Sequence, residues 1–294
     1  MEYLKKIRIL RALTTIMLIM AAAVSIAQYI CVYDLSYITA QIAEAGNDEF
    51  RKMDFGDGSI DVIVKCADEW DITPGELAAS LMLMHHYSVT AQDAAEQTEG
   101  DVRAFMRRMY RFCPEQFKDM ADYYEALIDD SENAFFPVPL STDSRKKWIS
   151  YVNSWGYERT YGGNRTHEGT DIMSPDNIRG RMPVIAAVGG TVVNIGWLEK
   201  GGWRIGVMSD NGVYYYYAHL DSYAQGIEKG SVVQPGTLLG MMGDTGYSVV
   251  EGTKGKFPVH LHYGIYIYND GEEIGINPYS FLRYYEKIVP RYDY

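Results

Sequence analysis

Hydrophobic and polar residues follow three different patterns along the 294-residue chain. An uninterrupted apolar run comes first, from Ala12 to Tyr33. From Asp34 to about Asp130, apolar residues recur every three or four positions, which is the period of an amphipathic helix. Beyond residue 136, short apolar or alternating runs are separated by glycine-rich turns, as in antiparallel sheets. The pattern therefore predicts three segments: 1–33, 34–135 and 136–294.

The first segment predicts a membrane-spanning helix. Four lysines and arginines between residues 5 and 11 precede 22 uncharged residues, and about 20 apolar residues span a bilayer core as a helix. Basic residues on one flank stay cytoplasmic, so the C-terminus would lie outside the cell. A cleaved signal peptide is the alternative, because Ser25 and Ala27 have the size and spacing of a cleavage site. The apolar run continues past that site, which favours a single-pass anchor over secretion.

The second segment, 34–135, predicts a small α-helical domain. Its clearest helix start is Thr73-Pro74-Gly75-Glu76, where Thr can cap the helix, Pro takes the first position and Glu the third. Methionine and aromatic residues at helical spacing are expected to form ordinary core. His85 and His86 are adjacent and diverge by about 100° on a helix, so they are expected to be structural rather than metal ligands.

The third segment, 136–294, predicts a mainly β domain built on an antiparallel sheet. Pro137 and Pro139 end the helical pattern, because each disfavours helix in the residue before it. Asn211-Gly212 lies between two apolar runs, which is a strong hairpin signal. The expected strands are 184–187, 190–195, 206–209, 213–219, 238–242 and 259–268.

Composition and charge restrict the class of protein. Hydrophobic residues make up 47% and charged residues 22% of the chain, which is typical of a globular protein. The formal net charge of −12 argues against nucleic acid as a partner, because that binding depends on Lys and Arg. By segment the charge is +3, −14 and −1, a shift that supports a boundary near residue 136. The acidic second segment could bind a protein partner, or could act as a spacer that an anionic membrane surface repels.

The three cysteines, Cys31, Cys66 and Cys113, include no CxxC pair, which excludes a thiolate zinc ribbon and a thioredoxin-type site. Outside the cell Cys66 and Cys113 could form a disulfide, and the sequence leaves this open. Any metal must therefore be held by histidine and carboxylate.

Histidines are concentrated in the third segment. Four of the six in the chain lie there: His167, His219, His260 and His262. Alternation along 259–268 places His260 and His262 on one face of a strand, about 7 Å apart. The same parity argument places His219 on the strand face that carries Tyr215 and Tyr217.

A further candidate motif is His167-Glu168-Gly169-Thr170-Asp171. Gly169 weakens a helix and the fifth residue is Asp, so a turn leading into a strand is predicted instead of the helical His-Glu-x-x-His zinc motif. Two histidines and one aspartate would leave a fourth tetrahedral position open, which is the catalytic rather than the structural zinc pattern. The alternative, a hydrogen-bonded sheet histidine, explains any single residue well but explains all the clusters together poorly.

Several stretches between residues 136 and 285 form a specific set. They are Arg165 to Asp171, Pro183 to Val192, Tyr217-Ala-His-Leu220, Val233 to Gly240 with Gly243-Asp-Thr-Gly246, and His260-Leu-His262. Together they resemble the lysostaphin-like (LytM-type) zinc metallopeptidases, which cut peptide bonds of bacterial peptidoglycan. The resemblance implies that His167, Asp171 and His262 bind one Zn²⁺ per chain. It also implies that His219 and His260 are catalytic residues beside the scissile carbonyl, with the general base left open between them.

We therefore expect a membrane-anchored zinc endopeptidase that acts on stem or cross-link peptides of peptidoglycan. The alternatives are a wall scaffold or activator of another hydrolase with the same fold, and a zinc hydrolase of some other peptide. The stretch 249–258 is longer than the resemblance implies, and could be a groove wall or a surface turn. Tyr214 to Tyr217 could line a groove, although strand aromatics more often pack within a sheet. Glu168 is expected near the surface and not as a base.

Overall fold

The computed structural model of the chain describes residues 2–43, 48–161, 163–269 and 271–294. Its helices are α1 (Glu2–Ala43), α2 (Asp48–Lys52), α3 (Ser59–Trp70), α4 (Pro74–Met84), α5 (Ala91–Glu96), α6 (Glu99–Phe112), α7 (Pro114–Glu132) and α8 (Tyr279–Tyr285). Its short strands are β1 (Asp54–Phe55), β2 (Ser88–Val89), β3 (Leu140–Ser141), β4 (Glu158–Arg159), β5 (Arg165–Thr166) and β15 (Arg291–Tyr292). The remaining strands are β6 (Thr170–Met173), β7 (Pro183–Ile185), β8 (Gly190–Leu198), β9 (Gly202–Met208), β10 (Tyr214–Tyr223), β11 (Val232–Val233), β12 (Leu238–Met242), β13 (His260–Asn269) and β14 (Glu272–Ile276).

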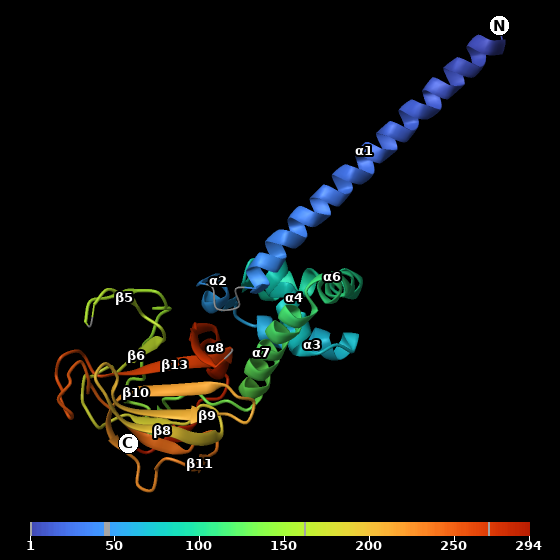
Figure 1. Cartoon of the computed structure of the whole chain (residues 1–294). Helices are drawn as coiled ribbons and strands as arrows, with labels where there is room; N and C mark the ends of the chain where they lie inside the picture. Colours follow the sequence, from blue (N-terminus) through green and yellow to red (C-terminus); the bar gives the residue numbers. More distant parts are fainter. Residues whose placement is uncertain (1, 44–47, 162, 270) are drawn as a thin grey trace.

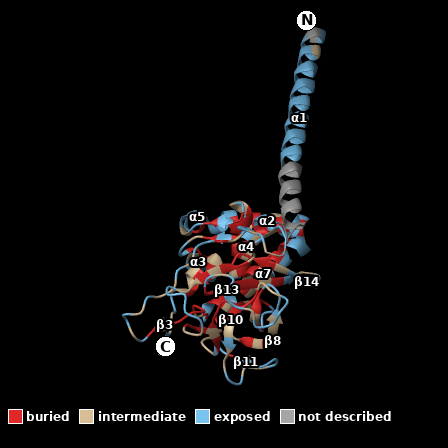
Figure 2. Ribbon diagram, turned by 90° about the vertical axis from the view of Figure 1, so that its left-hand side faces the viewer, coloured by how far each residue is buried: buried red, intermediate tan, exposed pale blue. Residues whose placement is uncertain are grey.

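Helix α1 is a long rod that projects away from the rest of the chain (Figure 1). Its part from Lys5 to Ile30 is long and apolar enough to cross a membrane, by length and composition alone, and a signal sequence would have the same properties. Large apolar side chains on it are exposed, including Met17 at 71% and Leu18 at 66% (Figure 2). Exposed apolar surface of this extent marks contact with lipid or with another protein.

Helix α4 begins as its sequence predicts. The Thr73 hydroxyl accepts a hydrogen bond from the Glu76 amide at 3.1 Å, and the Glu76 carboxylate accepts one from the Thr73 amide at 3.4 Å. This reciprocal capping satisfies two amide groups that would otherwise lack partners. Helix α4 then packs closely on α7, where the Gly75 amide donates to the Glu125 carboxylate. Gly75 is required there, because a Cβ would collide with the backbone carbonyl of Ala121.

The helical region also contains Cys66, for which the sequence leaves a disulfide open, and His85, for which it predicts a structural role. Cys66 has a free thiol, so the Cys66–Cys113 disulfide is not present. Burial raises the pKa of the Cys66 thiol. His85 follows the end of α4, with one ring nitrogen 3.4 Å from the Gln97 amide nitrogen, a contact that fits the expected structural role.

Strands β6 to β14 form one antiparallel sheet of nine strands within the described residues, as the sequence predicts. Its order is β11-β8-β9-β10-β12-β7, and β13 pairs with β10, β14 and β6. Strand β10 lies at its centre, with β9 on one side and first β13, then β12, on the other. Strand β14 and helix α8 are additional elements that the sequence pattern does not predict.

Strand β10 reverses its side-chain alternation at His219, so the parity prediction for this residue is wrong. Tyr215 and Tyr217 are fully buried in the core, whereas His219 lines the same pocket as Tyr216. The cause is a bulge: His219 has a φ of +64°, and the register with β9 shifts between Tyr217 and Leu220. A β-bulge adds one residue to a strand and turns the next side chain to the other face.

The helices and the sheet share one hydrophobic core. Helix α7 reaches the sheet through Asp130, whose carboxylate accepts hydrogen bonds from the Tyr215 hydroxyl at 2.8 Å and the Asn211 amide at 2.9 Å. Phe55 packs edge-to-face on Phe281 of α8, with ring centroids 5.8 Å apart. A domain boundary near residue 136 stays a prediction, and helices within residues 48–135 pack directly on the sheet.

The contact between α4 and α7 generates a stability prediction. Gly75→Ala should lower the free energy of unfolding by about 1–3 kcal/mol, because overpacking costs more than the gain in helix propensity of up to ~1 kcal/mol. Gly100→Ala is the matched control on α6, since its nearest neighbouring atom would lie 3.8 Å from the new Cβ. Urea unfolding of the full chain, followed by circular dichroism, checks this. Equal stability changes in the two variants would contradict it.

Candidate active site

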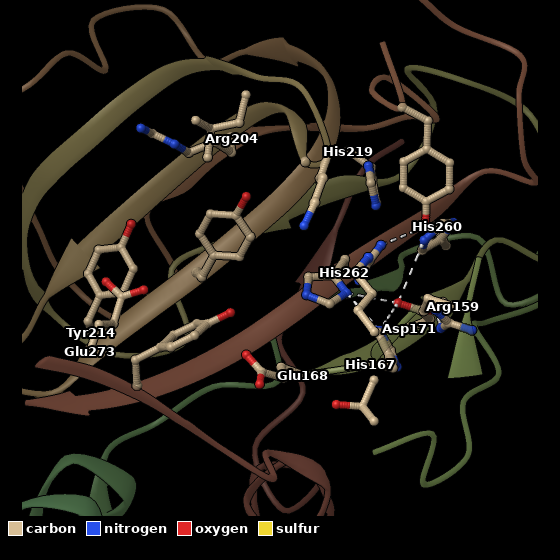
Figure 3. A pocket seen from close by; sticks show the side chains of 18 of the residues that line it. Arg159, His167, Glu168, Asp171, Arg204, Tyr214, His219, His260, His262 and Glu273 are labelled. Atoms are coloured by element: carbon tan, nitrogen blue, oxygen red, sulfur yellow. Dashed lines mark hydrogen bonds and ion pairs between the residues drawn. The ribbon is translucent and has the colours of Figure 1, made fainter. Parts of the chain in front are cut away.

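The five residues singled out in the sequence meet at one end of a pocket on the sheet face (Figure 3). Asp171 on β6 and His262 on β13 are direct cross-strand partners. His167 precedes β6, His260 begins β13 and His219 is turned toward them by the bulge in β10. The strand pairing thus gathers side chains that are distant in sequence, and the alternation predicted for His260 and His262 is confirmed.

Three donor atoms form a compact triangle. His167 Nε2 and His262 Nδ1 each lie 3.0 Å from Asp171 Oδ1, and 2.9 Å from each other. These residues form a group of His and Asp side chains that could hold a metal ion. Tetrahedral ligands about 2.0–2.1 Å from zinc stand roughly 3.3 Å apart, so the donor set fits such an ion with small adjustment.

Backbone carbonyls orient three of the four imidazoles. A carbonyl can only accept, so a ring whose Nδ1 bonds to one must carry its proton on Nδ1 and present a lone pair at Nε2. Fixing the ring in this way makes Nε2 a ready metal ligand or proton acceptor. The pairs are His167 with Ser154 O at 3.0 Å, His219 with Thr245 O at 2.7 Å, and His260 with Pro258 O at 2.7 Å.

The Asp171 carboxylate is held in its charged form. Burial raises the pKa of Asp171, but its 3.0 Å contacts with ring nitrogens of His167 and His262 outweigh burial and hold that pKa well below its usual range. Its second oxygen accepts a hydrogen bond from Arg159 Nη2 at 2.5 Å. Arg159 lies on β4 and is a site residue that the sequence did not reveal.

Burial also favours the neutral form of three imidazoles, those of His219, His260 and His262. It lowers the pKa of His219 well below the ordinary value, and the neighbouring His260 and His262 lower it further. Burial likewise lowers the pKa of His260 and of His262. A neutral imidazole is the form that binds a metal or accepts a proton. The rings of His219 and His260 lie 4.8 Å apart, so they face the same region of the pocket.

Beyond this cluster the pocket continues along the sheet between tyrosine rings. Tyr214, Tyr216 and Tyr266 line it, whereas Tyr215 and Tyr217 pack in the core. Within the tyrosine run, Tyr214 and Tyr216 therefore line the groove, and Tyr215 and Tyr217 pack within the core. Each ring that lines the pocket lies close to a glycine on or beside a strand, and a Cβ on that glycine would collide with the ring. The pairs are Gly201 with Tyr216, Gly206 with Tyr214, and Gly264 with Tyr266.

The long stretch 249–258 contributes no residue to the lining of the pocket. Val249 is 78% exposed, as in a surface turn. Phe257 instead packs against His219, with ring centroids 4.6 Å apart, and against Tyr247 at 4.7 Å. Glu168 pairs with Arg51 of α2, and its exclusion as a base stays a prediction.

Known peptidases resemble this chain in sequence and in fold. The sequence model of Peptidase family M23 matches residues 165–276. The structure aligns with that of a Ruminococcus gnavus protein described as a glycyl-glycine endopeptidase, lytM, at a TM-score of 0.66 and 41% identity, over 85% of this chain and 95% of that one. The chain belongs to peptidase family M23. The resemblance to lysostaphin-like peptidases seen in the sequence is confirmed.

Two curated M23 relatives show how far the similarity extends. The L-Ala--D-Glu endopeptidase of Bacillus subtilis is 44% identical over 167 residues, which is 57% of this chain and 47% of the relative. Lysostaphin of Staphylococcus simulans is 31% identical over 142 residues, which is 47% of this chain and 26% of the relative. The chain therefore spans about half the length, or less, of these curated relatives.

Arg159 provides a test of how the M23 site is held together. Arg159→Gln should weaken Zn²⁺ affinity about 10- to 100-fold, as typical losses of a residue that orients a ligand do. The measurement is competition with a chromogenic chelator on the purified full chain. Arg145→Gln is the control, because Arg145 is exposed and its ion pair is with Asp143. Unchanged affinity in Arg159→Gln would show that Asp171 is held without this contact.

Proposed function

We propose that this chain is a zinc-dependent endopeptidase that hydrolyses peptide bonds of bacterial peptidoglycan. The observation that carries the proposal is the triangle of His167, Asp171 and His262 donor atoms, each 2.9–3.0 Å from the other two. Membership of family M23 and relatives named as endopeptidases support the same activity.

His167, Asp171 and His262 would hold one Zn²⁺ per chain. Such an ion supplies Lewis acidity toward a carbonyl and lowers the pKa of water toward neutrality. Two neutral imidazoles and one carboxylate offset only one of its two charges, which suits a site that must stabilise developing negative charge. The hydrogen bond from Arg159 leaves Asp171 Oδ1 directed toward the two imidazoles.

His219 and His260 would handle the protons. Their Nε2 atoms carry lone pairs, because their Nδ1 protons bond to Thr245 and Pro258 carbonyls. One imidazole accepts a proton at Nε2 from the attacking water, and the resulting imidazolium returns it to the departing amine nitrogen. His260 Nε2 lies 3.7 Å from Asp171 Oδ1. The second histidine would have to gain a proton at Nε2 before it could donate a hydrogen bond to the carbonyl oxygen, and we leave the choice of base between the two open.

Helix α1 would anchor the enzyme, with its C-terminal part outside the cell. Four basic residues precede the apolar stretch, and such residues remain on the cytoplasmic side. The exposed apolar side chains of α1 are consistent with lipid contact.

Proteolysis of intact cells tests the anchor. Protease added to wall-stripped cells that express the chain should remove residues beyond the anchor and leave a membrane-bound stub starting at Met1. The stub is identified by mass spectrometry, and a cytoplasmic marker protein that stays uncut is the control. A soluble mature protein that begins at Gln28 would mean that the segment is a signal peptide.

Four substitutions separate metal ligands from proton-transfer residues. His262→Ala and Asp171→Ala should lose both Zn²⁺ and cleavage, because each removes a direct ligand. His219→Ala and His260→Ala should retain about one Zn²⁺ per chain and lose about 10²-fold or more of cleavage, since general acid–base catalysis contributes that much.

The measurements are zinc content and mass spectrometry of products released from purified peptidoglycan by the full chain in detergent. Stoichiometric zinc in His262→Ala or Asp171→Ala would overturn the ligand assignment. If the wild-type chain binds zinc and releases no product, the scaffold or activator alternative replaces the enzyme. A protein partner for 34–135 would then be sought.

A further inference from the structure

Arg204 at the far end of the groove has a buried donor without a partner. It lies on β9, at the end of the pocket opposite Arg159 and Asp171 (Figure 3). Its Nη1 atom is buried and has no hydrogen-bond partner among the residues that the structure describes. Leaving such a donor unpaired is costly, and more so when the group is charged. Because Nη1 is buried, a ligand reaches it only when the guanidinium turns toward the pocket that Arg204 lines, and a hydrogen bond accepted there would remove this cost.

The charges that line the pocket leave the groove cationic. Arg159 pairs with Asp171, and the Glu168 carboxylate pairs with Arg51 outside the pocket lining. The cations that remain in the lining are Arg165, Lys200 and Arg204.

Glu273, the remaining carboxylate of the lining, offsets the charge of Arg204 only in part. Glu273 is exposed and accepts a hydrogen bond from the Tyr268 hydroxyl at 2.9 Å. Solvent screens such a charge, whereas the buried Arg204 Nη1 is screened much less.

Tyrosine hydroxyls beside Arg204 add neutral donors. Burial raises the pKa of Tyr214 and of Tyr216, an effect that the charge of Arg204 partly offsets. Both hydroxyls therefore stay protonated at neutral pH. The Tyr214 hydroxyl accepts a hydrogen bond from Asn194 Nδ2 at 3.3 Å, which leaves its own proton free to donate. A guanidinium flanked by hydroxyl donors suits a carboxylate, which accepts several hydrogen bonds at once.

We propose that Arg204, with Tyr214 and Tyr216, forms a subsite for a carboxylate of the substrate peptide. This rests on the proposed endopeptidase function and deepens it, because it selects an acidic peptide over a glycine bridge. A glutamate within a peptide keeps one free carboxyl group whichever of its carboxyls is linked. The interior of an all-glycine peptide has none and would leave Arg204 Nη1 unpaired. Among the relatives, the Bacillus subtilis enzyme is named for an L-Ala--D-Glu bond.

The experiment compares matched substrates on the full chain in detergent. The substrates are an acylated L-Ala–D-Glu–L-Lys peptide with an amidated C-terminus, the same peptide with the glutamate carboxyl converted to a carboxamide, and acylated pentaglycine with an amidated C-terminus. The wild-type chain should prefer the acid peptide. Arg204→Met should lower kcat/KM for the acid peptide about 10- to 100-fold, the range for a hydrogen bond to a charged group, and change the carboxamide peptide little. Arg145→Met is the control for a lost surface charge.

Calorimetric binding of the acid and carboxamide peptides to the zinc-depleted chain gives a readout that does not need catalysis. Selective binding of the acid peptide, lost in Arg204→Met, supports the subsite even if no peptide is cleaved, in which case only the proposed function fails. Preference for pentaglycine, or equal losses on both peptides in Arg204→Met, overturns the subsite while the endopeptidase stands. If Arg204→Met does not fold, Arg204→Gln is judged by the same two ratios.

Discussion

The structure depends on holding two imidazole nitrogens and one carboxylate oxygen about 3 Å apart at Asp171. Lone pairs at that distance repel one another unless a cation or shared protons lie between them. The surrounding structure must therefore hold each side chain through its backbone or through the atoms that face away from the triangle. Cross-strand pairing of Asp171 with His262 sets the first contact. The Ser154 carbonyl then fixes the His167 ring, and Arg159 fixes the far carboxylate oxygen.

The need to bring ring nitrogens toward Asp171 also explains the bulge at His219 in the central strand β10. If β10 were a regular strand, His219 would be buried among the core tyrosines. Its ring nitrogens could not then face the site. The positive φ at His219 and the register shift beside it turn the imidazole onto the site face. Its Nδ1 then reaches the Thr245 carbonyl at 2.7 Å. Backbone strain of this kind persists where the surrounding structure over-determines it, which is often at a functional site.

The sequence predicts those parts of the site that depend on regular, local structure. His260 and His262 lie on one face because β13 alternates without interruption, and α4 begins at Pro74 because its capping residues are local. The prediction for His219 is wrong because an argument from alternation assumes a strand without a bulge. Arg159 and Arg204 carry no local signal at all, since each is one arginine among many until the fold brings it into the pocket. The contacts between glycines and tyrosine rings could not be predicted either. A glycine in a strand indicates that another group approaches closely, but the sequence does not show which group it is.

The helical segment and the sheet are joined by contacts that charge does not indicate. The shift from −14 to −1 near residue 136 supports a domain boundary, and one hydrophobic core joins the helices to the sheet. Arg51 of α2 donates to the Gly275 carbonyl at 2.9 Å and pairs with Glu168, the residue next to His167. Its guanidinium also lies 5.4 Å from the Trp155 ring centre. Because the loop that carries His167 is held in part by α2, displacing the helical segment would disturb a candidate metal ligand, so the segment is part of the site's support.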